Sequence, residues 1–89
     1  MARFEVPSLQ MIETAAEGGG ADALFELGLM YCVGRGVGTD LVEAHKWFNL
    51  AALGGNVEAR RYRTEISSEM TRMEIGRAQR AAREWLSRH

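Results

Sequence analysis

Apolar residues in this 89-residue chain recur every three or four positions, which is the spacing of one face of a helix. Glycine-rich segments at 18–20, 34–38 and 54–55 interrupt the pattern, and glycine favours helix ends because it adopts the left-handed conformation. No segment alternates as a strand would. The pattern therefore predicts an all-α fold with helices over about 9–17, 21–33, 41–53, 57–70 and 72–87.

Polar residues at the expected helix starts support these boundaries. Ser8, Thr39 or Asp40, and Asn56 stand where N-caps are needed. Asp40 with Glu43, and Thr71 with Glu74, have the spacing of a capping box. Gly28 lies inside the second helix, at a cost of about 1 kcal/mol relative to alanine. We expect the backbone of a neighbouring helix to approach closely there.

The chain contains an internal repeat. The segment AAEGGGADA at 15–23 returns in modified form as AALGGNVEA at 51–59, 36 residues later. A repeat of this length is typical of helical solenoids.

The residues from 21 to 59 resemble the Sel1-like repeat (SLR) family, which is related to the tetratricopeptide repeat. The resemblance rests on Ala23, Leu27, Gly28, Tyr31, Gly34, Gly36, Val37, Asp40, Ala44, Trp47, Phe48, Ala51, Ala52, Gly55 and Ala59. It covers one complete repeat at 21–56, and residues 8–20 resemble the end of a preceding repeat. It implies a short α-α superhelix built from tetratricopeptide-like helix pairs.

The resemblance stops after Ala59. A second repeat would place Leu-Gly at 63–64 and tyrosine at 67, but the chain has Arg63, Thr64 and Ser67 there. We therefore expect residues 57–89 to form divergent capping helices within a single domain, 1–89. Solenoids usually need at least three repeats, so either these helices complete a compact unit or the protein pairs with itself or a partner.

The resemblance implies a non-enzymatic protein–protein interaction module, because proteins with this repeat are commonly adaptors in assembly, secretion or signalling. In tetratricopeptide-like geometry the first helix of each pair lines the concave surface. Phe25 and Leu29 would be apolar anchors, and Lys46 and the C-terminal arginines would set orientation. The alternative is that the fourth or fifth helix covers these residues. The expected partner-binding residues are Asp22, Phe25, Leu29, Cys32 and Val33.

Charge is unevenly distributed along the chain. Residues 1–56 carry three basic and seven acidic groups, whereas residues 57–89 carry eight arginines and five glutamates. Solvated helix faces would explain this asymmetry, but an acidic half could also meet the basic half of a second copy. Nucleic-acid binding is not expected, because glutamates interrupt the arginines.

The sequence offers no catalytic residues, cofactor site or metal site. Gly34, Gly36 and Gly38 follow a predicted helix, whereas a phosphate-binding loop follows a strand. Cys32 lacks a basic neighbour that would favour a thiolate, and we expect it to be a packing residue. We expect His45 to be solvated or at a groove edge, and His89 to be frayed. No signal peptide or membrane-spanning segment is evident, which favours a soluble cytoplasmic protein.

Overall fold

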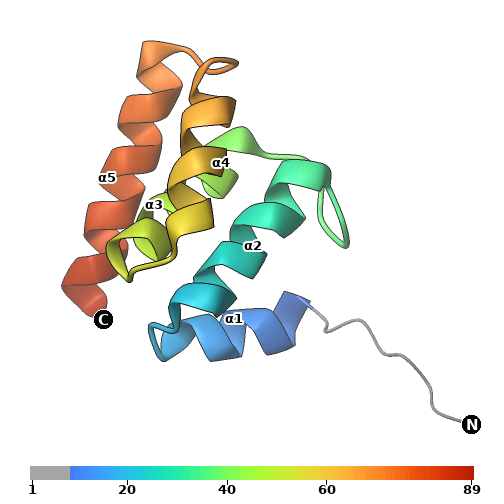
Figure 1. Ribbon diagram of the computed structural model, residues 1–89, viewed down its shortest axis with the longest axis vertical. Coiled ribbons are helices and arrows are strands. Elements are labelled where there is room, and N and C mark those ends of the chain that lie inside the picture. Colours follow the sequence, from blue (N-terminus) through green and yellow to red (C-terminus); the bar gives the residue numbers. More distant parts are fainter. Residues whose placement is uncertain (1–8) are drawn as a thin grey trace, which may run out of the picture.

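The computed structural model describes residues 9–89 and contains five α-helices and no strand within them (Figure 1). The helices are α1 (Leu9–Glu17), α2 (Ala21–Val33), α3 (Leu41–Leu53), α4 (Val57–Ser67) and α5 (Arg72–Arg88). The all-α prediction is confirmed. Helix α4 ends three residues earlier than predicted and α5 ends one residue later, while the Ser8 cap lies outside the described residues.

Helix α3 is at the centre of the molecule. It packs against α2, α4 and α5, and α1 crosses the start of α2 (Figure 1). Because α3 has neighbours on three sides, its buried residues cover more than half of its circumference, and Leu53 lies on the exposed remainder. The buried residues of α3 are Ala44, His45, Trp47, Phe48, Leu50 and Ala51.

The close packing of α2 on α3 explains Gly28. A Cβ atom at this position would clash with the Phe48 ring, which is fully buried. The prediction of close approach is thus correct for the position, but an aromatic ring approaches rather than a helix backbone. Phe48 can occupy this space only because residue 28 has no side chain.

The turn between α2 and α3 is closed by local hydrogen bonds. Gly34 has φ 76°, and its N–H donates to the Met30 carbonyl over 2.8 Å. The Asp40 N–H donates to the Tyr31 carbonyl over 3.0 Å, and its carboxylate accepts from the Glu43 N–H over 3.1 Å. The glycine-rich segment 34–38 is therefore the joint of a helix pair.

The predicted capping boxes differ in outcome. At α5 the box is complete, because the Thr71 hydroxyl accepts from the Glu74 N–H and the Glu74 carboxylate accepts from the Thr71 N–H. At α3 only Asp40 caps the helix. The Glu43 carboxylate instead accepts a 2.9 Å hydrogen bond from Trp47 Nε1.

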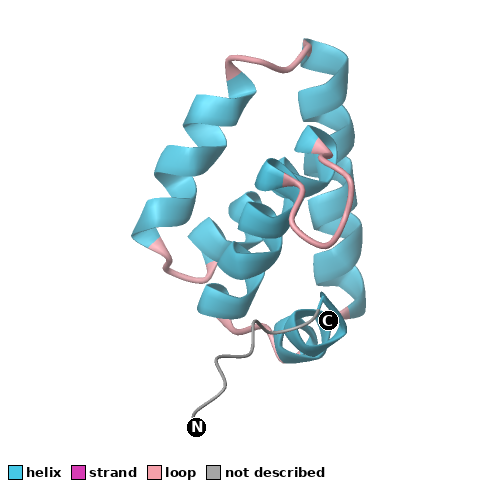
Figure 2. Ribbon diagram, turned by 90° about the vertical axis from the view of Figure 1, so that its right-hand side faces the viewer, coloured by secondary structure: helices cyan, strands magenta, loops and turns pink. Residues whose placement is uncertain are grey.

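Helices α4 and α5 both pack on α3, and their backbones make few close approaches to each other. In Figure 2 the two helices descend from the loop at the top on opposite sides of the view. Helix α5 contacts α3 through Ala78, Ala82 and Trp85, and the Trp85 ring meets Trp47 edge-on at 6.0 Å. The small alanines allow α5 to approach α3.

His45 is buried in this packing, with an exposed fraction of 3%, so the prediction of a solvated or groove-edge histidine is wrong. The Ser67 hydroxyl donates to the Arg63 carbonyl, and His45 Nε2 therefore donates to Ser67 Oγ over 3.1 Å. Nδ1 has no hydrogen-bond partner among the described residues. Burial, and secondly the nearby Arg63 charge, lower the pKa of His45 and favour the neutral ring.

Candidate functional site

The predicted partner-binding residues follow one side of α2, and Tyr62 of α4 reaches that side. Phe25 is half-buried, with its ring 5.7 Å from Phe48 and 5.5 Å from Tyr62. Leu29 is also half-buried and packs against the core. The Tyr62 ring thus lies against one side of Phe25, and the other side of Phe25 stays partly accessible.

Cys32 lies farther along the same side and faces the acidic end of α4. Burial raises the pKa of its thiol, and the charges of Glu69 and Glu65 raise it further. The thiol is therefore protonated at neutral pH, and its nucleophilicity is low. This setting suits a packing residue.

The two ends of the predicted surface remain accessible. Val33, the last residue of α2, has an exposed fraction of 67%. At the other end Asp22 is exposed and accepts a hydrogen bond from Asn56 Nδ2 over 3.2 Å. The middle of this surface therefore consists of half-buried side chains. Exposed Val33 lies at one end and the Asp22 carboxylate at the other.

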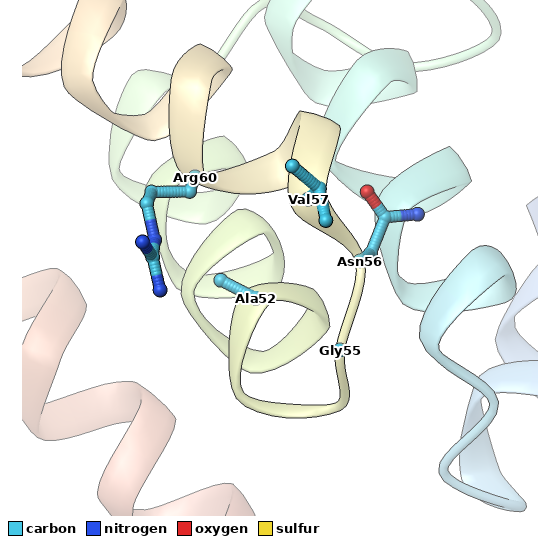
Figure 3. Close-up of a pocket in the computed structure, with 5 residues that line it drawn as sticks. All are labelled: Ala52, Gly55, Asn56, Val57 and Arg60. Carbon is cyan, nitrogen blue, oxygen red and sulfur yellow. The ribbon is translucent and has the colours of Figure 1, made fainter.

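A small pocket of about 220 Å³ lies where α3 leads into α4 (Figure 3). Ala52 comes from α3, Gly55 and Asn56 from the turn, and Val57 and Arg60 from the first turn of α4. The Asn56 side chain caps α4 by accepting from the Ala59 N–H over 2.9 Å. Sequence reasoning missed this pocket, because its residues were explained by the boundary between two helices.

A second pocket, of about 270 Å³, brings the end of α1 close to the C-terminal end of α5. It lies between the α1–α2 turn, the end of α3 and the end of α5, and Leu53 and Leu86 are among the residues that line it. The end of α5 lies near α1 in Figure 1. His89 closes one side of this pocket, donating from Nε2 to the Glu17 carboxylate over 2.7 Å.

The prediction that His89 is frayed is wrong. Its ring stacks on Trp85 at 4.0 Å, and its Nδ1 lies 2.8 Å from the Trp85 carbonyl. Since both ring nitrogens face acceptors, the doubly protonated form fits best. The hydrogen bond to the Trp85 carbonyl, followed by that to Glu17, raises the pKa of His89. Sequence reasoning missed this contact because Glu17 and His89 are 72 residues apart.

Two further features bear on the class of protein. Within residues 9–89, the histidine, cysteine and carboxylate side chains form no group of three or more that could hold a metal ion. In the same part of the chain no helix has both the length and the apolar character needed to cross a membrane.

Comparison with known families agrees with the geometry of α2 and α3. Residues 21–56 match the family model of the Sel1 repeat. The chain carries a Sel1 repeat. The match begins at the first residue of α2 and ends at Asn56, the N-cap of α4. No curated protein matches the sequence.

A Sel1 repeat is a tetratricopeptide-like helical hairpin, and α2 with α3 form that hairpin here. Sel1 repeats are generally protein-interaction modules and typically belong to non-enzymatic scaffolds.

Proposed function

We propose that this protein is a non-enzymatic adaptor that binds a partner protein or peptide through the outer side of α2. The observation that carries the proposal is the exposure of Val33, the last residue of α2, beside Phe25 and Leu29, which pack against the core. An apolar side chain that stays in water at the rim of a packed surface can become buried on binding. Asp22 would set orientation at the opposite end.

The packing changes the role expected for the predicted anchors. Phe25 packs against the rings of Phe48 and Tyr62, which also contact each other, so it would support the binding surface more than contact the partner. Leu29 and Cys32 are half-buried and would offer only their outer edges. The proposed contact is therefore a shallow surface ending at Val33.

Affinity capture from the native cell, read by mass spectrometry, tests this proposal. We expect Val33→Asp to lose a protein that the wild type captures, because a charge would replace the exposed apolar contact. Val57→Asp is the matched control, since Val57 is also a helix-terminal valine and has an exposed fraction of 81%. Equal loss of the partner in both variants, or loss in neither, would contradict a site at the end of α2.

Phe25→Asp serves a different purpose. The substitution would place a carboxylate against two aromatic rings, and we expect it to unfold the protein rather than only to weaken binding. Circular dichroism distinguishes these outcomes. A fully helical Phe25→Asp variant would show that the ring is dispensable for packing and return Phe25 to the role of direct anchor.

A further inference from the structure

The solvent-facing side of α5 carries a line of arginines that make no hydrogen bond or ion pair stabilising the fold of residues 9–89. Arg72, Gly76, Arg80 and Arg83 are separated by four, four and three residues, so they lie on one side of the helix. The opposite side, with Ala78, Ala82 and Trp85, is buried on α3. We call the line through Arg72, Gly76, Arg80 and Arg83 the arginine stripe. Helix α5 is at the outer edge of the molecule (Figure 1).

The stripe has no carboxylate partner within the described residues. None of its three arginines makes a hydrogen bond or ion pair there, whereas Arg61 on α4 pairs with Glu58 and Glu65. On α5 itself, Glu74 is engaged in the capping box, and Glu84, the other carboxylate of this helix, makes no ion pair with the stripe. The three guanidinium groups are thus available, over about 16 Å of helix.

Gly76 is the second, independent feature of the stripe. It lies inside α5, where glycine costs about 1 kcal/mol relative to alanine. Unlike Gly28, it is not required by packing, because a Cβ atom there would meet only the Arg80 guanidinium, at 3.5 Å. Gly76 leaves a notch between Arg72 and Arg80, bordered by the flexible Arg80 guanidinium, and a second backbone can approach α5 there once that side chain turns outward.

An exposed methionine adjoins this notch. Met73 has an exposed fraction of 77% and lies three residues before Gly76, on the neighbouring line of the helix. Arginine and methionine are enriched in protein–protein interfaces, and lysine is depleted. Every basic residue of 57–89 other than His89 is an arginine, whose planar group binds carboxylates in a bidentate manner.

We infer that the arginine stripe, with Met73, is a docking surface for an acidic amphipathic helix of a partner protein. This deepens the proposed function, on which it rests. Carboxylates at helical spacing would meet the arginines, an apolar residue would cover Met73, and the partner backbone would approach at Gly76. A second copy of this chain fits less well, because its Glu17, Glu26 and Glu43 are engaged with His89, Arg35 and Lys46. A nucleic acid would use neither the notch nor Met73.

The test uses the full chain and, as a probe, a helical alanine-rich peptide with glutamates on one side and a leucine beside them. Calorimetry at low salt measures binding to the peptide and to a mixed-sequence oligonucleotide. We expect combined Arg72→Gln, Arg80→Gln and Arg83→Gln to weaken peptide binding about tenfold, the sum expected for three exposed charge pairs. Tighter binding of the oligonucleotide than of the peptide would overturn the inference.

Single substitutions provide matched controls. Arg80→Gln should weaken binding more than Arg61→Gln, since Arg61 is already paired on α4. Gly76→Gln keeps the charge and fills the notch, and we expect it to weaken binding several-fold while α5 remains helical. Equal effects of Arg80→Gln and Arg61→Gln, or wild-type affinity of Gly76→Gln, would overturn the docking geometry.

Two outcomes separate this inference from the proposed function. Absence of peptide binding together with capture that still depends on Val33 would reject the arginine stripe and leave the adaptor proposal standing. Salt-sensitive dimerisation in sedimentation experiments, abolished by the three arginine substitutions, would assign the stripe to a second copy and overturn the inference.

Discussion

The α2–α3 pair and the α4–α5 pair differ in what lies between their helices. Helices α2 and α3 pack directly on each other, with the Phe48 ring seated against Gly28. Helices α4 and α5 pack on α3 instead, through Tyr62, Ile66, Ala82 and Trp85. The first pair is held by direct packing of Gly28 against Phe48. The second pair is held by the packing of each helix on α3.

The connections match this difference. Seven residues, 34–40, join α2 to α3 and fold back through hydrogen bonds to Met30 and Tyr31. Four residues, 68–71, join α4 to α5 and end in the Thr71 capping box. At the position where a second repeat would have glycine, α4 has Thr64. Loss of the Leu-Gly pair in α4 thus accompanies loss of direct packing between α4 and α5, and it leaves more of α5 exposed.

The largest expected effect comes from Phe48→Ala. Phe48 is fully buried and contacts Phe25 and Tyr62 as well as Gly28, so it links both helix pairs. Removing a buried ring costs about 3–5 kcal/mol of unfolding free energy. Urea denaturation followed by circular dichroism measures the change. Met73→Ala is the control and should change stability by less than about 0.5 kcal/mol, because Met73 is exposed.

Alanine substitutions at Gly28 and Gly76 compare the packing of α2 with that of α5. We expect Gly28→Ala to destabilise the protein by about 1–3 kcal/mol, since its methyl group would force the Phe48 ring to move. Gly76→Ala should stabilise the protein by about 0.5–1 kcal/mol, because alanine favours the helix and has room there. The same denaturation experiment measures both. Effects of equal sign would show that the two helix environments are alike.

The caps provide the next comparison. Thr71→Ala removes the hydroxyl half of a complete capping box, and Asp40→Ala removes a single cap. Each should cost about 1 kcal/mol. Hydrogen exchange locates the effect, and we expect faster exchange at the start of α5 in the first variant and of α3 in the second. Exchange that rises across all helices in both variants would contradict local capping.

The two histidines should give the smallest effects, with opposite signs. The folded pKa of His45 is lowered, so the unfolded chain takes up the proton more readily and stability falls as pH drops below the ordinary histidine pKa. The folded pKa of His89 is raised, so its contribution is complete at low pH and is lost as pH rises through the folded pKa.

Thermal unfolding between pH 5 and pH 8 tests this pair of signs, in a range where histidines titrate. His45→Gln should lessen the loss of stability towards acid pH, and His89→Gln should make that loss steeper. The Glu17→Gln variant is the matched control for the His89 contact. Identical pH profiles for the wild type and His45→Gln would show that the buried ring does not titrate with folding.

Much of the fold could be predicted from the sequence because local signals set it. Apolar spacing and glycine positions predicted both ends of α2 and the start of α4. The Thr71 capping box predicted the start of α5. The end of α4 was less predictable, since Ser68, Glu69 and Met70 can continue a helix and close into a turn here. The partner-binding residues remain predictions. Their spacing on α2 was evident, but the covering of Phe25 by Tyr62 depends on a different helix.

By itself, the sequence determined that this chain is helical, that it contains one Sel1 repeat, and that the repeat pattern ends at Ala59. These properties follow from local backbone preferences and from periodicity, both of which depend on residues that are close in sequence. The burial of His45, the contact of His89 with Glu17, and the absence of ion pairs to the α5 arginines among residues 9–89 emerge only from the tertiary structure. The reason is physical: burial and ion pairing depend on which helices lie side by side, and those neighbours are far apart in sequence.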